Sequence, residues 1–161
     1  MTEKDYNECV TLYADNVYRF ILKNIKNEED AKDIVQTSFE KMWVHRATVE
    51  NNTSKSFLFT VAYNAMIDFI RKNKRIILKE DFNETAQGST NQAYNTKRIL
   101  QEALSTLNQR DKSLVMLKDY EGYSYAEIGE ITGLNESQVK VYLHRARLQL
   151  KEYIVKIENV L

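Results

Sequence analysis

The chain is poor in the residues that interrupt helices. It contains no proline and only four glycines, whereas sheet proteins usually need more of these residues at their turns. Few stretches alternate between polar and apolar residues, which is the pattern expected of a half-buried strand. The sequence therefore predicts an all-α fold.

Cysteine, histidine and long apolar runs are also scarce. The single cysteine, Cys9, cannot form an internal disulfide, and no cysteine–histidine cluster suggests a metal site. No apolar run approaches membrane-spanning length, and no signal peptide opens the chain. We therefore expect a soluble cytoplasmic protein with no metal, no cofactor and no membrane insertion.

The residues of a catalytic site are not recognisable in the sequence. The two histidines, His45 and His144, are far apart in the chain, and no serine or cysteine nucleophile has an evident base. No glycine-rich loop is suited to hold a phosphate. We do not expect this protein to be an enzyme.

Neither sign of charge dominates the chain. Lysine plus arginine number 23, and aspartate plus glutamate also number 23. A neutral protein does not coat nucleic acid by charge alone, so any contact with DNA must come from local patches. Residues 1–43 are acidic, with six basic and nine acidic side chains, whereas basic residues gather at 71–79 and in the last helix.

The stretch Gly122–Arg147 is the most informative part of the sequence. Ser124 and Glu127 have the spacing of a capping box, which starts a helix. Gly133 follows where a turn needs a positive φ, and Asn135 is placed to cap a second helix. This pattern predicts a helix-turn-helix whose second helix would enter a DNA major groove.

The second helix of this motif has two distinct faces. Its apolar residues recur at helical spacing and predict a buried stripe of Val139, Leu143, Ala146 and Leu150. From Ser137 to Lys151 the sequence contains no acidic residue, and such a helix attracts phosphates.

Hydrophobic periodicity organises the rest of the chain into helices. The predicted helices cover residues 4–25, about 28–43, 56–74, 96–106, 109–121, 125–132 and 136–157. Residues 76–95 are polar with little periodicity and are interpreted as a flexible linker. We expect an N-terminal three-helix bundle in residues 1–75, a linker in 76–95, and a C-terminal four-helix helix-turn-helix domain in 96–161.

Two blocks of the sequence resemble bacterial sigma factors of the sigma-70 family. Residues 30–43, DAKDIVQTSFEKMW, resemble the region 2 helix, and residues 56–72, SFLFTVAYNAMIDFIRK, resemble the segment that follows it. Residues 107–150 resemble region 4. Having only these two regions is typical of the extracytoplasmic function (ECF) sigma factors.

The resemblance implies a role in transcription initiation. Members of this family bind core RNA polymerase, direct it to promoters through the −35 and −10 elements, and help to open the DNA. An anti-sigma factor is the expected regulator, because the family usually works in that way.

For polymerase binding, the resemblance points to the helix of residues 28–43. An exposed mixture of acids and large apolar groups suits a protein interface with an aromatic anchor. The candidates are Asp30, Asp33, Ile34, Gln36, Phe39 and Trp43. Ile34 and Phe39 could equally be plain core residues, and Asp30 could be only a helix cap.

For the −10 element, the resemblance points to the polar loop 46–55 and the third helix. Asn64 matches a family position near the pocket for a flipped base, and an amide can read a base edge. Phe57 could stack on a base or fill the space under the loop. The phosphate candidates are Arg71, Lys72, Lys74 and Arg75, whose alternative role is a solvated helix end.

For the −35 element, the candidates occupy the first turns of the recognition helix, which penetrate the groove most deeply. Base edges would be read by Glu136, Ser137, Lys140, Val141 and His144, and phosphates would be bound by Arg145 and Arg147.

Two other functions are compatible with the motif. A stand-alone helix-turn-helix regulator would dimerise through its N-terminal bundle and bind a palindromic site without polymerase. An all-α adaptor would bind only protein. The block at residues 30–43 and the absence of a heptad-like dimer seam favour the sigma factor over both.

Overall fold

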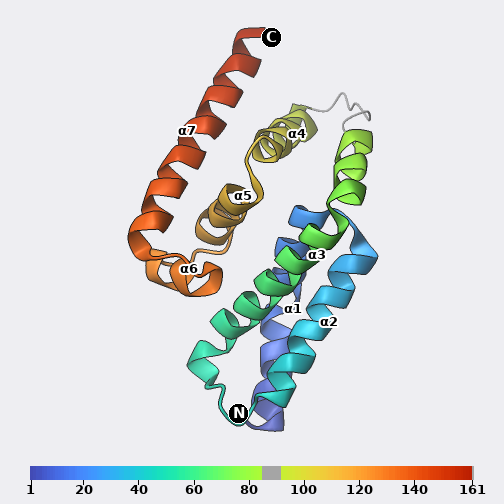
Figure 1. Ribbon diagram of the computed structural model, residues 1–161, viewed down its shortest axis with the longest axis vertical. Coiled ribbons are helices and arrows are strands. Elements are labelled where there is room, and N and C mark those ends of the chain that lie inside the picture. The colour runs from blue at the N-terminus through green and yellow to red at the C-terminus, as the bar shows by residue number, and fades with distance from the viewer. Residues whose placement is uncertain (85–91, 161) are drawn as a thin grey trace. The chain divides into compact units, whose positions relative to one another are not determined.

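The structure is a computed structural model that describes the backbone of residues 1–84 and 92–160 and the side chains of residues 1–73 and 96–159. In these ranges every regular element is helical, which confirms the predicted all-α fold (Figure 1). The chain divides into two compact units. One contains Met1–Asn83 and Gly129–Gly133, and the other contains Glu84–Ile128 and Leu134–Leu161.

The first unit is built on three long helices, which lie alongside one another in Figure 1. Its elements are α1 (Glu3–Ile25), α2 (Glu28–Val44), the 3-10 turn η1 (Asn51–Thr53) and α3 (Ser54–Glu84). Polar side chains fix where the first two helices begin. The Asp5 N–H donates to Thr2 Oγ1 at 3.1 Å, and the Asp30 N–H donates to Asn27 Oδ1 at 3.0 Å. Lys26 ends α1 with a left-handed φ of 57°, so the chain turns back directly into α2.

The core of this unit combines apolar residues from all three helices. The rings of Phe20 and Phe59 pack with centroids 5.6 Å apart and join α1 to α3. On α3 the apolar residues Val61, Ala65 and Phe69 are only half-buried. The buried residues of these helices include Val17, Phe20, Ile21, Ile25, Ala31, Met42, Leu58, Phe59, Ala62 and Met66.

The second unit contains the remaining helices, except that the second half of α6 is grouped with the first unit. They are α4 (Gln92–Ser105), α5 (Gln109–Val115), the π-helical segment η2 (Met116–Tyr120), α6 (Tyr125–Thr132) and α7 (Glu136–Val160). Asn108 starts α5, since its Oδ1 accepts the Asp111 N–H at 2.8 Å. Helix α7 packs against α4 and α5. The predicted stripe of α7 is confirmed for Val139, Leu143 and Ala146, which are buried, whereas Leu150 is half-buried.

The segment expected as a linker is helical at both ends. Helix α3 continues to Glu84 through a kink at Asn73, where φ is −120°, and α4 already begins at Gln92. The predicted helix ends near residues 74 and 96 were therefore wrong; no glycine or proline precedes Gly88 in this segment to stop a helix. Residues 85–91 lie outside the described part, and the domain boundaries at 75 and 96 stay a prediction.

Among the residues that the structure describes, no helix combines the length and the apolar character needed to cross a bilayer.

Candidate functional site

The turn between α6 and α7 has the geometry that the sequence predicted. Ser124 and Glu127 cap α6 reciprocally, with N–H to side-chain oxygen distances of 3.1 and 3.2 Å. Asn135 and Gln138 cap α7 in the same way, at 3.0 and 2.8 Å. Between the two helices Gly133 has a φ of +79°, which a residue with a side chain adopts only under strain. The sequence therefore positions the start of α7 through local hydrogen bonds and one permissive residue.

The beginning of α7 presents its polar side chains to solvent. Ser137, Val141 and His144 follow one another at helical spacing on one exposed face, and Val141 is 45% exposed. Lys140 Nζ lies 3.4 Å from Glu136 Oε1, and both side chains are more than half exposed. An exposed pair of this kind contributes little, so a DNA phosphate could replace the carboxylate as the partner of Lys140.

Arg147 has a partner that the sequence did not reveal. Its Nη2 donates to Asp119 Oδ1 at 2.6 Å and its Nε donates to Oδ2 at 3.3 Å. These hydrogen bonds to Asp119 raise the pKa of the Arg147 guanidinium above its ordinary value. Arg147 joins α7 to η2 through the Nε and Nη2 side of its guanidinium, and its phosphate contact stays a prediction. Arg145, two residues earlier, is exposed.

Tyr125, the first residue of α6, lies near two lysines of the same unit. Lys118 Nζ is 4.5 Å from the centre of its ring, and Lys140 Nζ is 5.4 Å away. Both distances are within the range of cation–π attraction. Sequence reasoning missed Tyr125 and Asp119, because their partners are many residues away and no local pattern marks such contacts.

On α2 the six polymerase candidates separate into exposed and buried residues. Asp33, Gln36 and Trp43 are exposed, and Asp30 is half-buried in the first turn. Ile34 and Phe39 are each only 7% exposed, so they are core residues. The sequence had left this role open as an alternative to polymerase binding. Val44, which the sequence analysis did not single out, is 72% exposed. Of the exposed residues of α2, we define six as the α2 surface: Glu29, Asp33, Gln36, Glu40, Trp43 and Val44.

On α3 three of the −10 candidates share one helix face. Phe57, Asn64 and Arg71 follow one another at intervals of seven residues, which is close to two helical turns. Asn64 is exposed, whereas Phe57 is half-buried with its ring centre 6.1 Å from that of His45. Arg71 Nη1 lies 3.9 Å from Asp68 Oδ1 in a loose exposed pair. Lys72 is also exposed, and the side chains of Lys74 and Arg75 lie outside the described residues.

The loop before α3 is anchored at its centre and exposed at its end. Val49 is only 6% exposed and attaches the loop to the core. Ser54 Oγ donates to the carbonyl oxygen of Asn51 at 2.8 Å, which closes the turn η1. The polar side chains of Asn51, Asn52 and Thr53 are exposed. The fold therefore presents hydrogen-bonding groups beside the start of α3.

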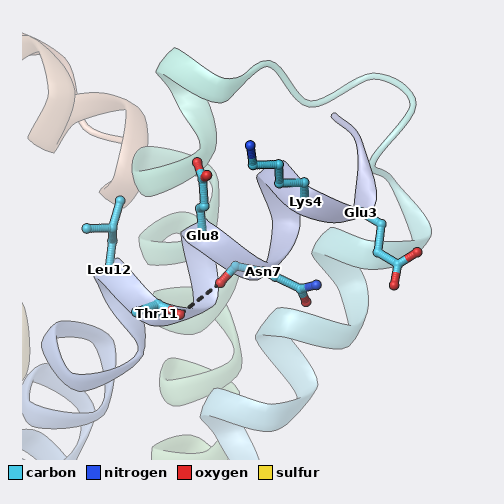
Figure 2. A pocket seen from close by; sticks show the side chains of 6 residues that line it. All are labelled: Glu3, Lys4, Asn7, Glu8, Thr11 and Leu12. Carbon is cyan, nitrogen blue, oxygen red and sulfur yellow. Dashed lines mark hydrogen bonds between the residues drawn. The ribbon is translucent and has the colours of Figure 1, made fainter.

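A surface hollow lies along α1, and none of the predicted site residues lines it. Figure 2 shows that its lining comes from a single helix, where the Thr11 hydroxyl donates to the Asn7 carbonyl oxygen at 3.0 Å. Leu12 at its end is 63% exposed. One helix face cannot surround a small ligand, so this hollow is unlike a cofactor or substrate pocket.

Comparison with known proteins matches two regions of the chain. The family model "Sigma-70 region 2" matches residues 9–76, and "Sigma-70, region 4" matches residues 97–150. The RNA polymerase sigma factor SigV of Bacillus subtilis is 35% identical, over 88% of this chain and 89% of that protein. The ECF RNA polymerase sigma factor SigM of the same organism is 30% identical, over 90% of this chain and 92% of its own.

A solved structure has the same fold. The sigma factor RpoE of Bartonella quintana, determined in complex with the anti-sigma factor NepR, superposes with a TM-score of 0.73. The match covers 94% of this chain and 97% of that chain at 23% sequence identity, so it speaks for the fold alone. The two matched regions and the relatives in Bacillus subtilis show that the chain belongs to the ECF sigma factors of the sigma-70 family.

Proposed function

We propose that this transcription initiation factor divides its task among three helices. The α2 surface binds core RNA polymerase, the loop before α3 and the exposed face of α3 hold the opened −10 element, and α7 reads the −35 duplex. The observation that carries the proposal is the contrast between the acid-free stretch of α7 from Ser137 to Lys151 and the acidic α2 surface with its exposed tryptophan. The polymerase carries out the chemistry in the cytoplasm, and this chain is not itself an enzyme.

The α2 surface is suited to a protein partner. Trp43 offers an apolar ring that is 36% exposed, and the neighbouring Val44 extends the apolar area. Glu40, about one turn before Trp43, and Asp33, nearly three turns before it, add negative charge to the same helix. An aromatic centre with a polar rim is the usual composition of an energetically important contact.

The recognition helix is suited to duplex DNA. Ser137, Lys140 and His144 supply hydrogen-bonding groups near its N-terminus, and Val141 supplies an apolar group that suits a thymine methyl. Arg145 supplies a charge for the phosphate backbone. No acid follows Glu136 until Glu152, so nothing on this length of α7 repels the DNA.

The exposed face of α3 is suited to a single strand. Asn64 can both donate to and accept from a base edge. Phe57 is half-buried, so only part of its side chain is available to support a base. Arg71 and Lys72 supply charge at the end of this face.

We also propose that an anti-sigma factor regulates the chain. The support is indirect: the Bartonella quintana RpoE of similar fold was determined bound to its anti-sigma factor NepR.

Co-elution with bacterial core RNA polymerase on size exclusion tests the proposal. The expected result is a stoichiometric complex that Trp43→Ala weakens at least about 30-fold, as for an interface hot spot. Leu12→Ala is the matched control, because it also removes an exposed apolar side chain of the first unit. Failure of the folded wild-type chain to bind would instead favour a stand-alone regulator and a search for a palindromic site.

Variants of the other two helices separate their roles. Lys140→Ala and Arg145→Ala should reduce promoter use while co-elution with polymerase is retained. Asn64→Ala should leave the closed complex intact but reduce permanganate reactivity of the −10 thymines, with the exposed Asn7→Ala as control. Normal melting by Asn64→Ala would remove this residue from the proposed site.

A further inference from the structure

The indole ring of Trp43 is in contact with two residues outside the α2 surface. The ring of Tyr6, on α1, approaches it edge-on, with centroids 4.9 Å apart and an interplanar angle of 66°. The guanidinium carbon of Arg46, just beyond the end of α2, lies 4.1 Å from the centre of the indole. The tryptophan is still 36% exposed, so these contacts support the ring without covering it.

Tyr6 is itself held to the backbone of α2. Its hydroxyl donates to the Phe39 carbonyl oxygen at 3.1 Å, and its ring packs at 89° against that of Phe39, with centroids 6.5 Å apart. Phe39 is buried in the core. Burial raises the pKa of the Tyr6 phenol, so the hydroxyl remains a donor at neutral pH. Tyr6 is therefore a fixed wall beside Trp43.

Arg46 is held over the indole by a hydrogen bond to the backbone of Trp43 itself. Its Nη1 donates to the Trp43 carbonyl oxygen at 2.8 Å, and its backbone N–H approaches the same oxygen at 3.3 Å. A solvent-exposed arginine normally samples many rotamers. Here the side chain folds back, so its charged plane lies against the aromatic ring, where cation–π attraction favours it.

A ring that is already immobile loses less entropy when it binds a partner. We propose that Tyr6 and Arg46 are positioning residues, which hold the indole of Trp43 in its polymerase-binding orientation before the polymerase arrives. This inference rests on the proposed function of the α2 surface. Because preorganisation of an existing contact acts chiefly on the lifetime of a complex, the effect should appear in the dissociation rate.

Trp43 reports on its own fixation, because it is the only tryptophan in the chain. In the free full-length protein, Tyr6→Ala and Arg46→Ala should each lower its fluorescence anisotropy and increase its quenching by acrylamide. Tyr18→Ala and Arg19→Ala are the matched controls: Tyr18 is also half-buried on α1, about 18 Å further along that helix. Circular dichroism verifies the fold of each variant, and the exposed Arg46 allows the test even if Tyr6→Ala does not fold.

The kinetic arm uses core RNA polymerase. Arg46→Ala and Tyr6→Ala should dissociate about 2- to 10-fold faster than the wild type, as expected for the loss of one aromatic or cation–π contact. Association rates should stay within about twofold. The inference is overturned if Trp43 stays as immobile as in the controls, or if it becomes mobile while dissociation is unchanged. If Trp43→Ala binds polymerase like the wild type, both the proposed function of the α2 surface and this inference fail. If Trp43→Ala binds weakly while Arg46→Ala dissociates at the wild-type rate, only this inference is contradicted.

Discussion

The pairing of Arg147 with Asp119 makes a quantitative prediction about how α7 holds DNA. A protein that neutralises phosphates releases counterions, so the logarithm of its affinity falls linearly with that of the salt concentration, by about 0.9 per phosphate contact. The guanidinium of Arg147 is already bound to a carboxylate at 2.6 and 3.3 Å, whereas Arg145 is exposed. Of these two arginines, only Arg145 should therefore contribute to the slope.

The perturbations are Arg145→Ala and Arg147→Ala, which remove the same charge two residues apart. Arg145→Ala should flatten the salt dependence by about 0.9, so its affinity deficit shrinks about 3.5-fold between 50 and 200 mM salt. Arg147→Ala should leave the slope unchanged. The side chains of Arg147 and Asp119 are 44% and 43% exposed, so loss of their ion pair should lower the free energy of unfolding by only about 0–1 kcal/mol.

The assay is fluorescence-monitored binding of the polymerase complex to a promoter selected from random DNA, repeated over a salt series. Asp119→Ala provides a third arm, because it releases the guanidinium and should steepen the slope by up to about 0.9. The double variant of Asp119 and Arg147 should return to the slope of Arg147→Ala. A slope that flattens as much in Arg147→Ala as in Arg145→Ala would refute the reasoning, since Arg147 would then leave Asp119 to bind phosphate.

Three further predictions concern the fold. Gly133→Ala should lower the free energy of unfolding in urea by about 1–2 kcal/mol, because its φ of +79° is strained for alanine; an unchanged stability would contradict the required turn geometry. Cys9 is 4% exposed and burial raises the pKa of its thiol, so we expect it to react at least about tenfold more slowly with a thiol reagent in the native protein than in denaturant. Hydrogen bonds from Thr2 to the Asp5 carboxylate lower the pKa of Asp5 below its ordinary 3.8, and the bond from the Thr2 backbone contributes most. The stabilisation of α1 by Asp5 is therefore present above pH 3.8 and is lost as the pH falls through the lowered pKa. In a pH titration, the amide resonances of the first turn of α1 should report this loss in the wild type and not in Asp5→Ala. Identical titration curves for the two proteins would contradict the stabilising role of Asp5.

The helix starts could be predicted because their signals are local. Ser124 and Asn135 each bond within three residues, so the sequence contains the whole interaction. The same holds for Asn108, which caps α5. The turn at Gly133 was equally readable, since few residues tolerate a positive φ. These signals positioned the recognition helix correctly.

The remaining features depend on contacts between distant residues. Asp119 and Arg147 are 28 residues apart, and Tyr6 lies 33 residues from the carbonyl group of Phe39 to which it donates. The sequence spacing of these partners does not distinguish them from the other tyrosines, arginines and acids of the chain. On α3, apolar residues occur on more than one side, so periodicity alone could not show that Met66 faces the core and Ala65 does not. The continuation of α3 to Glu84 was missed because polar composition was taken as a sign of a linker.

The neutral total charge has a physical consequence for a protein that must bind both a protein and DNA. The acids of the α2 surface, Glu29, Asp33 and Glu40, repel phosphates, so this surface is poorly suited to DNA and remains available for polymerase. Helix α7 has the opposite arrangement, with no acid between Ser137 and Lys151. Asp119 is an acid close to α7, and its charge is matched by Arg147. Under the proposed function, local charge would direct each partner to a different helix, which an even distribution of the same 23 positive and 23 negative side chains could not do.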